Sequence, residues 1–172
     1  MANLADFLHT VTLFQDLDGP TLSTLASLLA QRRMKAGGTI FRESEVSDAL
    51  YVVERGRVVV SKHVHGDVDI VITRFQPGDF FGEMGLFDAA PRSASALAEV
   101  DTTLWALQRD AFNKILADHA EIGAKVCYRL VRVFIDRLRA TNEQAREAIR
   151  WGLEATGYSP STDPVLLDRK ST

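Results

Sequence analysis

The spacing of apolar side chains changes twice along the 172-residue chain and divides it into three parts. In the first part, apolar residues recur every three or four positions over residues 4–11 and again over 22–29, which predicts two short helices. Asp18-Gly19-Pro20 stands before the second of them. A polar cap followed by proline is typical of a helix start, because the first turn does not need the N–H group that proline lacks.

From Gly37 onward, short runs rich in β-branched residues alternate with glycines, which predicts strands. The predicted strands are Thr39–Arg42, Ala49–Val53, Arg57–Val64, Val68–Phe75, Ser93–Val100 and Thr102–Leu107. Gly66-Asp67 lies between two alternating runs and predicts a tight hairpin loop. Many short strands at this spacing favour a jelly-roll-like β-roll, so that the fold class with its flanking helices is α+β.

After Leu107 the helical period returns. Residues 110–117 predict a short helix, and Asp118-His119-Ala120-Glu121 has the form of a capping box for a long helix that runs to about Thr156. We therefore expect a β-roll with N-terminal helices over residues 1–117, a long C-terminal helix over 118–156, and a flexible tail rich in Ser, Thr and Pro over 157–172.

A stripe of apolar and small residues follows the long helix further than a roll of this size can cover. Its members step by three or four positions: Ile122, Val126, Leu130, Phe134, Leu138, Thr141, Ala145, Ala148 and Gly152. Such a stripe predicts a partner helix, so we expect a homodimer with the helix as its seam.

Composition narrows the classes of function. The formal net charge of −3 argues against a broad nucleic-acid surface, which needs a basic excess. No apolar run reaches the roughly 18–20 residues of a spanning helix, and the start lacks the pattern of a signal peptide, so we expect a cytoplasmic protein without a membrane partner. The single cysteine, Cys127, cannot form a disulfide within the chain.

Catalytic and metal-binding motifs give little support to an enzyme or a metalloprotein. The sequence has no nucleophile elbow, no zinc-protease motif and no Walker loop, so no enzymatic activity is predicted. His63-Val64-His65 places two imidazoles on one face of a hairpin strand, which is a conceivable metal or haem contact. Because no third ligand is near, we predict neither a metal nor a cofactor.

The segment from Phe81 to Ser95 combines the groups that a cyclic phosphodiester needs. The guanidinium of Arg92 matches two phosphate oxygens as a planar fork, which a lysine cannot do. The carboxylate of Glu83 can accept the proton of a ribose 2′-hydroxyl. A turn that begins at Gly82 adds backbone N–H groups and the positive end of a short helix.

These residues resemble the phosphate-binding cassette of cyclic nucleotide-binding domains, as in catabolite activator proteins and protein kinase A regulatory subunits. The cassette reads Phe-Gly-Glu-x-(Gly/Ala)-Leu and, after a few residues, Arg-(Ser/Thr/Ala)-Ala, and the match runs from Phe81 to Leu86 and from Pro91 to Ala94. The resemblance implies that Arg92 pairs with the cyclic phosphate and that Glu83 takes the 2′-hydroxyl. It implies further ligand contacts, which are the Ser93 hydroxyl, the N–H groups of Ser93 and Ala94, and the turn at Gly82 and Met84.

Two other blocks extend the resemblance. Residues 38–43 and 48–58 are similar to the early β-roll of the family, with Ser44 where many members have glycine, a change expected to affect the turn and not the pocket. Residues 137–143 resemble the segment that covers the base in bacterial cyclic AMP receptors. That resemblance implies that Thr141 reaches the adenine amino group and that Asn142, in place of a serine, reaches the adenine held by the partner subunit.

Cyclic AMP is therefore the expected ligand. Cyclic GMP is the alternative, because the Ser93 hydroxyl can also bond the 2-amino group of guanine. We expect a sensor that signals through its helix to a separate, unidentified protein.

Two other functions stay open. One is a scaffold or dimerisation module with a degenerate pocket, in which Glu83 and Arg92 form only an exposed ion pair. The other is a truncated transcription regulator, although direct DNA binding is not expected because residues 158–172 are too few for a helix-turn-helix domain.

Overall fold

The computed structural model describes residues 3–65 and 68–156, which form two compact units. The first unit comprises residues 1–130 and the second comprises residues 131–172, and each is considered by itself. The boundary expected after residue 117 thus lies inside the first unit. The hairpin loop expected at Gly66-Asp67 and the tail expected over 157–172 lie outside the described residues.

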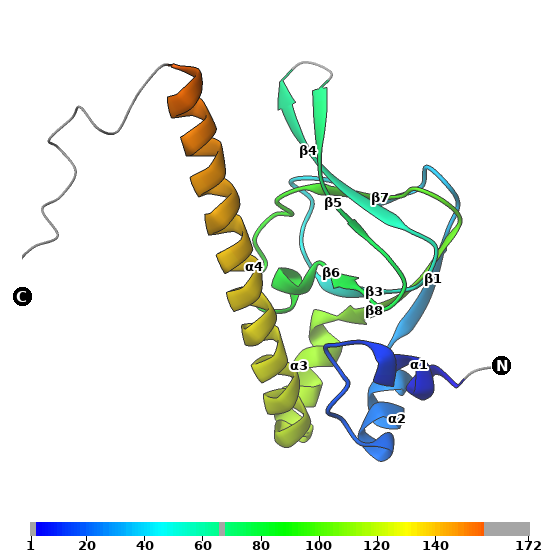
Figure 1. The fold of residues 1–172 in the computed structure, drawn as a ribbon. Coiled ribbons are helices and arrows are strands. Elements are labelled where there is room, and N and C mark those ends of the chain that lie inside the picture. The colour runs from blue at the N-terminus through cyan, green and yellow to red at the C-terminus, as the bar shows by residue number, and fades with distance from the viewer. Residues whose placement is uncertain (1–2, 66–67, 157–172) are drawn as a thin grey trace, which may run out of the picture. The chain divides into compact units, whose positions relative to one another are not determined.

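Both N-terminal helices are confirmed, as α1 (Leu4–Thr10) and α2 (Gly19–Ser27) (Figure 1). The Asp18 carboxylate accepts a hydrogen bond from the Thr21 N–H at 2.9 Å, and Pro20 occupies the first turn of α2. The helix therefore starts where the cap and the proline predict.

Two antiparallel four-stranded sheets form the β-roll, with strand orders β1-β8-β3-β6 and β2-β7-β4-β5 (Figure 1). The strands are β1 (Ala30–Met34), β2 (Thr39–Phe41), β3 (Ala49–Arg55), β4 (Val58–His65), β5 (Val68–Phe75), β6 (Phe80–Phe81), β7 (Ser95–Ala98) and β8 (Thr102–Gln108). Every predicted strand is present, and the α+β class with a β-roll is confirmed. Strands β1 and β6 were not predicted, because β1 is an edge strand with mostly exposed side chains and β6 has only two residues.

Aromatic rings fill one part of the core between the sheets. Tyr51 and Phe81 stack at 5.4 Å between ring centroids, and Phe75 stacks on Phe81 at 5.2 Å. The ring of Phe41, on β2, lies 5.9 Å from that of Tyr51. This cluster joins both sheets, and its Phe41 and Tyr51 rings also border the site described below.

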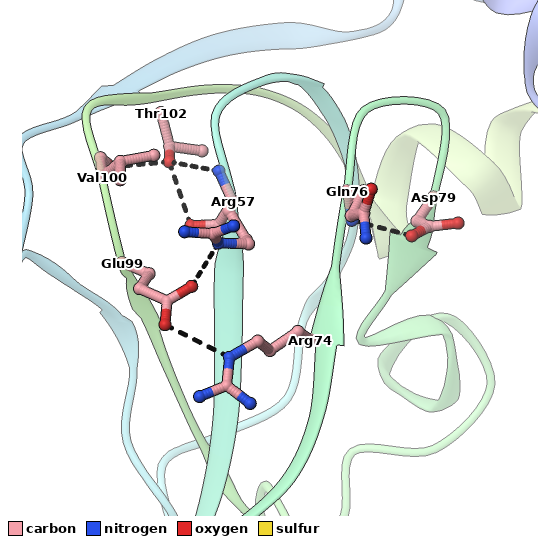
Figure 2. A network of polar contacts seen from close by, with 7 residues as sticks. All are labelled: Arg57, Arg74, Gln76, Asp79, Glu99, Val100 and Thr102. Atoms are coloured by element: carbon pink, nitrogen blue, oxygen red, sulfur yellow. Dashed lines mark hydrogen bonds and ion pairs between the residues drawn. The ribbon is translucent and has the colours of Figure 1, made fainter.

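A polar network ties β4, β5 and the turn after β7 together (Figure 2). The Glu99 carboxylate binds the side chain of Arg57, and it accepts a bond from Arg74 Nε at 3.2 Å. The Thr102 hydroxyl accepts the N–H of Arg57 at 3.2 Å. These contacts fix the ends of three strands relative to one another.

The chain continues into α3 (Arg109–Asp118) and α4 (Ala120–Ala155). Asp118 is the last residue of α3, so the predicted capping box at Asp118 is wrong and only His119 separates the two helices. A Cβ at Gly123 would lie 2.6 Å from Leu116 Cδ2, so this glycine lets α4 pack closely on α3. Among the helices of residues 3–65 and 68–156, none has the length and apolar character that crossing a bilayer requires.

The first part of the predicted stripe packs within the chain itself. Val126 and Leu130 are buried inside the first unit, where they pack on their own chain and are not free for a partner. In the second unit the large apolar side chains that are exposed are Val131, Ile135, Leu138, Ile149, Trp151 and Leu153, of which Leu138 belongs to the predicted stripe.

Candidate functional site

The turn that follows β6 begins at Gly82, whose φ of +74° is left-handed. A short 3₁₀ helix, η1 (Glu83–Leu86), follows it, and the Gly85 N–H donates to the Gly82 carbonyl at 3.1 Å. A Cβ at position 82 would lie 2.7 Å from Arg92 Nη1 and 3.0 Å from the Ala49 carbonyl oxygen. Glycine is therefore needed at this position for two reasons, which are the left-handed backbone conformation and the close approach of the Arg92 guanidinium.

Arg92 is buried, with 6% of its surface exposed. Its Nη1 donates to the Gly82 carbonyl at 3.2 Å, and its Nη2 donates to the Ala49 carbonyl at 3.0 Å. The Arg92 Cζ atom lies 4.1 Å from the centre of the Phe41 ring, a cation–π contact. The plane of the guanidinium is thus fixed by two carbonyls and one aromatic face.

The positive charge of Arg92 is only partly compensated by the surrounding protein. The nearest carboxylate is that of Asp48, at 3.6 Å from Nη2, and it is largely exposed. Burial lowers the pKa of Arg92, while Tyr51, Asp48 and Glu83 act in the opposite direction. Within the described part of the chain, Arg92 Nε is buried without a hydrogen-bond partner. A buried cation with an unused donor is a binding group for an anion, because an anion would supply both the charge and the acceptor.

The backbone of Arg92 is held by the turn that follows β2. The Ser44 N–H donates to the Arg92 carbonyl at 2.9 Å, and the Arg92 N–H donates to the Glu45 carbonyl at 2.8 Å. Ser44 has a φ of +68°, which explains why glycine suits this position in the family that the sequence resembles. The turn at Ser44 is therefore part of the support of the site.

The other cassette residues predicted from the sequence surround Arg92 along the chain. Glu83 is buried, with 6% exposed, so an exposed ion pair between Glu83 and Arg92 is excluded. Ala94 is buried, whereas Met84 and Ser93 are exposed. In the cassette, Glu83, Arg92 and Ala94 are thus buried, whereas the side chains of Met84 and Ser93 are exposed.

Thr141 and Asn142 belong to the second unit and are both exposed. The Thr141 hydroxyl donates to the Arg137 carbonyl of its own helix at 2.9 Å. Their contacts with an adenine ring remain predictions.

Three residues of the site were not singled out from the sequence: Phe41, Asp48 and Arg109. Phe41 and Asp48 lie within the blocks that match the family, but only the pairing of distant strands brings them to Arg92. Arg109 begins α3, where the positive end of the helix dipole disfavours a cation. A basic residue at the start of a helix therefore indicates that its side chain has acceptors outside that helix.

The histidine pair of the β4–β5 hairpin gains no support as a metal site. Within residues 3–65 and 68–156, no three His, Cys, Asp or Glu side chains are placed to hold a metal ion. His63 Nδ1 lies 3.1 Å from an Asp69 carboxylate oxygen across the hairpin.

The fold and the site together define a β-roll that holds a buried arginine beside a short turn. The family described as "Cyclic nucleotide-binding domain" matches residues 31–119, more than half of the chain, and the chain belongs to this family.

Known relatives agree with this assignment. The chain is 31% identical over 147 residues to the cAMP-dependent protein kinase regulatory subunit of Blastocladiella emersonii, covering 86% of this chain and 36% of that protein. It is 30% identical over 144 residues to a CRP-like cAMP-activated global transcriptional regulator of Mycobacterium tuberculosis, covering 84% and 62% respectively. The chain thus spans less than two thirds of either relative. A cyclic nucleotide-binding domain from Methylobacillus flagellatus superposes with a TM-score of 0.73 at 27% identity, covering 82% of this chain and 79% of that one.

Proposed function

We propose that this protein is a sensor that binds cyclic AMP at Arg92 and Glu83 and has no catalytic activity of its own. The observation that carries the proposal is the buried guanidinium of Arg92, whose Nε has no hydrogen-bond partner among the residues that the structure describes. A cyclic phosphodiester has one negative charge on two exocyclic oxygens, which suits the fork formed by Nε and a terminal nitrogen. Two of the relatives named above carry cyclic AMP in their names, as a cAMP-dependent protein kinase regulatory subunit and a cAMP-activated transcriptional regulator.

Glu83, Ser93, Ala94 and the turn at Gly82 and Met84 complete the proposed contacts. Glu83 accepts the ribose 2′-hydroxyl, and the remaining groups donate to the phosphate. Thr141 binds the adenine amino group, so the ligand favours the arrangement of helix and roll in which both are in contact with it. A ligand of about 22 heavy atoms at about 0.3 kcal/mol each gives a Kd near 10 μM.

Titration calorimetry with cyclic AMP, cyclic GMP and 5′-AMP tests the proposal. We expect a Kd near 10 μM for cyclic AMP, weaker binding of cyclic GMP, and little heat from 5′-AMP, whose open phosphate does not fit the same groups. Arg92→Lys keeps the charge and loses the fork, so affinity should fall about 10-fold or more. A folded wild-type protein that gives no heat with either cyclic nucleotide would instead support the scaffold function, and tighter binding of cyclic GMP would reverse the order of ligands.

We further propose that the second unit forms a parallel homodimer with its own copy. Its stripe alternates steps of four and three, as in a coiled coil, through Val131, Ile135, Leu138, Asn142, Ala145, Ile149 and Gly152. Arg132, Arg139 and Arg146 flank one side of this stripe. In an antiparallel pair these arginines would face one another, whereas in a parallel pair they face the uncharged flank of the partner, so charge favours the parallel pair.

Two glutamate substitutions on one helix test the dimer. Leu138→Glu places a charge in the stripe, and Ala140→Glu places the same charge on another face of α4 as a control. Sedimentation equilibrium should give a dimer for the wild type and for Ala140→Glu, and a monomer for Leu138→Glu. A wild-type protein that stays monomeric at about 100 μM contradicts the dimer.

The output of the sensor is proposed to be a protein contact through α4 and not direct DNA binding. Three arginines of the second unit lie close to carboxylates of the same helix: Arg139 at 3.8 Å from Asp136, Arg146 at 3.2 Å from Glu143 and Arg150 at 3.8 Å from Glu154. Such pairs leave little free positive charge for phosphates. A gel shift in which the protein retards duplex DNA at 0.1 M salt, about 10 Å Debye length, would contradict this part of the proposal.

A further inference from the structure

The guanidinium of Arg92 is closed to solvent in this structure. Its Nε atom is buried and has no hydrogen-bond partner among the described residues. A phosphate oxygen bonded to this nitrogen would lie about 2.7–2.9 Å from it, where an atom of the size of a water molecule has no room. An anion can therefore bind to Nε only after a neighbouring group has moved.

The groups that surround the guanidinium differ in how firmly they are held. Two of its acceptors are backbone carbonyls, those of Gly82 and Ala49. The buried Tyr51 ring lies 5.8 Å from Arg92 Cζ, on strand β3, which is paired on both sides by β8 and β6. The Phe41 ring is closer, at 4.1 Å from Cζ, and it is only half-buried. Phe41 is thus the close neighbour that is packed least tightly.

Strand β2, which carries Phe41, is held by few contacts. It has three residues, lies at the edge of its sheet and pairs with β7 alone, and its register shifts between Thr39 and Phe41. Short edge strands with few ladder bonds belong to the parts of a protein that open at low cost. The following turn stays with Arg92, because the Ser44 N–H donates to the Arg92 carbonyl. Movement of the Phe41 ring therefore requires only a local change in β2.

The closed position of Phe41 is nevertheless favourable. Its ring lies over the cationic guanidinium, and it packs at 5.9 Å from the Tyr51 ring and at 6.0 Å from the Phe81 ring. The face of the ring supplies part of the negative potential that an anion would otherwise supply to Arg92. The closed arrangement is thus expected to dominate, with the open one as a minor population.

We infer that Phe41 is a gate, a side chain that covers Arg92 until it swings away and lets a phosphate reach Nε. This inference rests on the proposed function, because the phosphate in question is that of the cyclic nucleotide. The rate constant for association is then the rate constant of the open protein multiplied by the fraction of molecules that are open. The gate tunes the sensitivity of the sensor without touching the ligand contacts themselves.

Stopped-flow binding of cyclic AMP with a fluorophore on adenine C8 tests the gate in the full chain. With an open fraction of about 10%, Phe41→Ala should raise the association rate constant about 10-fold. Phe41→Trp, whose larger ring binds a cation better, should lower it about threefold. The dissociation rate constant should stay within about twofold in both variants, so that Kd follows the association rate constant.

Phe75→Ala is the matched control, because Phe75 belongs to the same aromatic cluster and is also half-buried. Its ring stacks on Phe81 at 5.2 Å, whereas it is Phe41 that lies over Arg92. This variant should lower the melting temperature and leave the association rate constant within about twofold of the wild type. Phe41→Leu serves if Phe41→Ala does not fold, and should raise the association rate constant by a smaller factor.

The exchange of the Arg92 Nε–H proton with water separates this inference from the proposed function. A wild-type protein that binds neither cyclic AMP nor cyclic GMP refutes the proposed function, but the gate still predicts exchange about 10-fold faster in Phe41→Ala, without added nucleotide. Equal Nε–H exchange in wild type and Phe41→Ala overturns the gate. A weaker Kd caused by faster dissociation from Phe41→Ala also overturns it, since Phe41 would then hold the ligand and not exclude it.

Discussion

The close contact between Gly82 and Arg92 allows a backbone effect to be separated from an effect on ligand binding. In Gly82→Ala, a φ of +74° costs an L-residue about 1–2 kcal/mol. For a domain of this size that is a fall in Tm of about 2–8 °C. The new Cβ would also lie 2.7 Å from Arg92 Nη1, against about 3.4 Å for ordinary contact, so the guanidinium has to move. Displacing one charge-assisted bond is worth about 1.5–3 kcal/mol, so we expect cyclic AMP affinity to fall at least 10-fold.

Gly37→Ala provides the matched control for this experiment. Gly37 has a φ of +77°, and a Cβ there would have nothing within 4 Å. Differential scanning calorimetry should therefore show a similar backbone cost for both variants. Titration calorimetry should show a loss of cyclic AMP affinity for Gly82→Ala alone.

Two results would refute the reasoning. Equal cyclic AMP affinity in Gly82→Ala and wild type would mean that the guanidinium does not need the space above Gly82. Equal loss of affinity in Gly82→Ala and Gly37→Ala would mean that ligand binding responds to global stability and not to the position of Arg92.

The remaining predictions concern stability. Ser44→Gly removes the strain of a serine at φ +68°, so Tm should rise by about 2–4 °C, from about 1 kcal/mol, in a thermal melt; a fall would contradict the strain. Hydrogen bonds from Arg74 and Arg57 hold the pKa of Glu99 below its ordinary value. Because the folded-state pKa is the lower one, this stabilisation is complete above the unfolded-state pKa and is lost as pH falls through the folded-state pKa. Urea denaturation can be measured from pH 6 to pH 3, roughly the range around an ordinary glutamate pKa. The free energy of unfolding of the wild type should fall more over this range than that of Glu99→Gln. An equal fall in both proteins would contradict the role of Glu99.

The parts of the fold that sequence predicts are those fixed by local pattern. The strand over Val68–Phe75 and the helix start at Asp18 follow from β-branched residues and from a capping residue with proline, and both are confirmed. Strand β1, Ala30–Met34, escapes prediction because its exposed polar residues carry no alternation. The sequence also does not predict what covers each part of the helix stripe, because the pattern is the same whether the same chain or a partner covers Val126 and Leu130.

The candidate site divides in the same way. The cassette pattern indicates Arg92 and Glu83, since their spacing lies within one short segment. The burial of Arg92 against Phe41 and beside Asp48 depends on the pairing of distant strands, which no local pattern specifies. Arg109 is the residue whose partners are hardest to predict, because all three of its carbonyl acceptors belong to the backbone of other segments.

The Nε–H proton resonance of Arg92 tests the central claim most directly. In a ¹H–¹⁵N spectrum of the arginine side chains, the signal that disappears in Arg92→Lys identifies this group. On addition of cyclic AMP, we expect that signal to move downfield and to exchange more slowly with water, because the buried Nε gains a phosphate acceptor. An unmoved signal in a protein that calorimetry shows to be saturated with cyclic AMP would contradict the account.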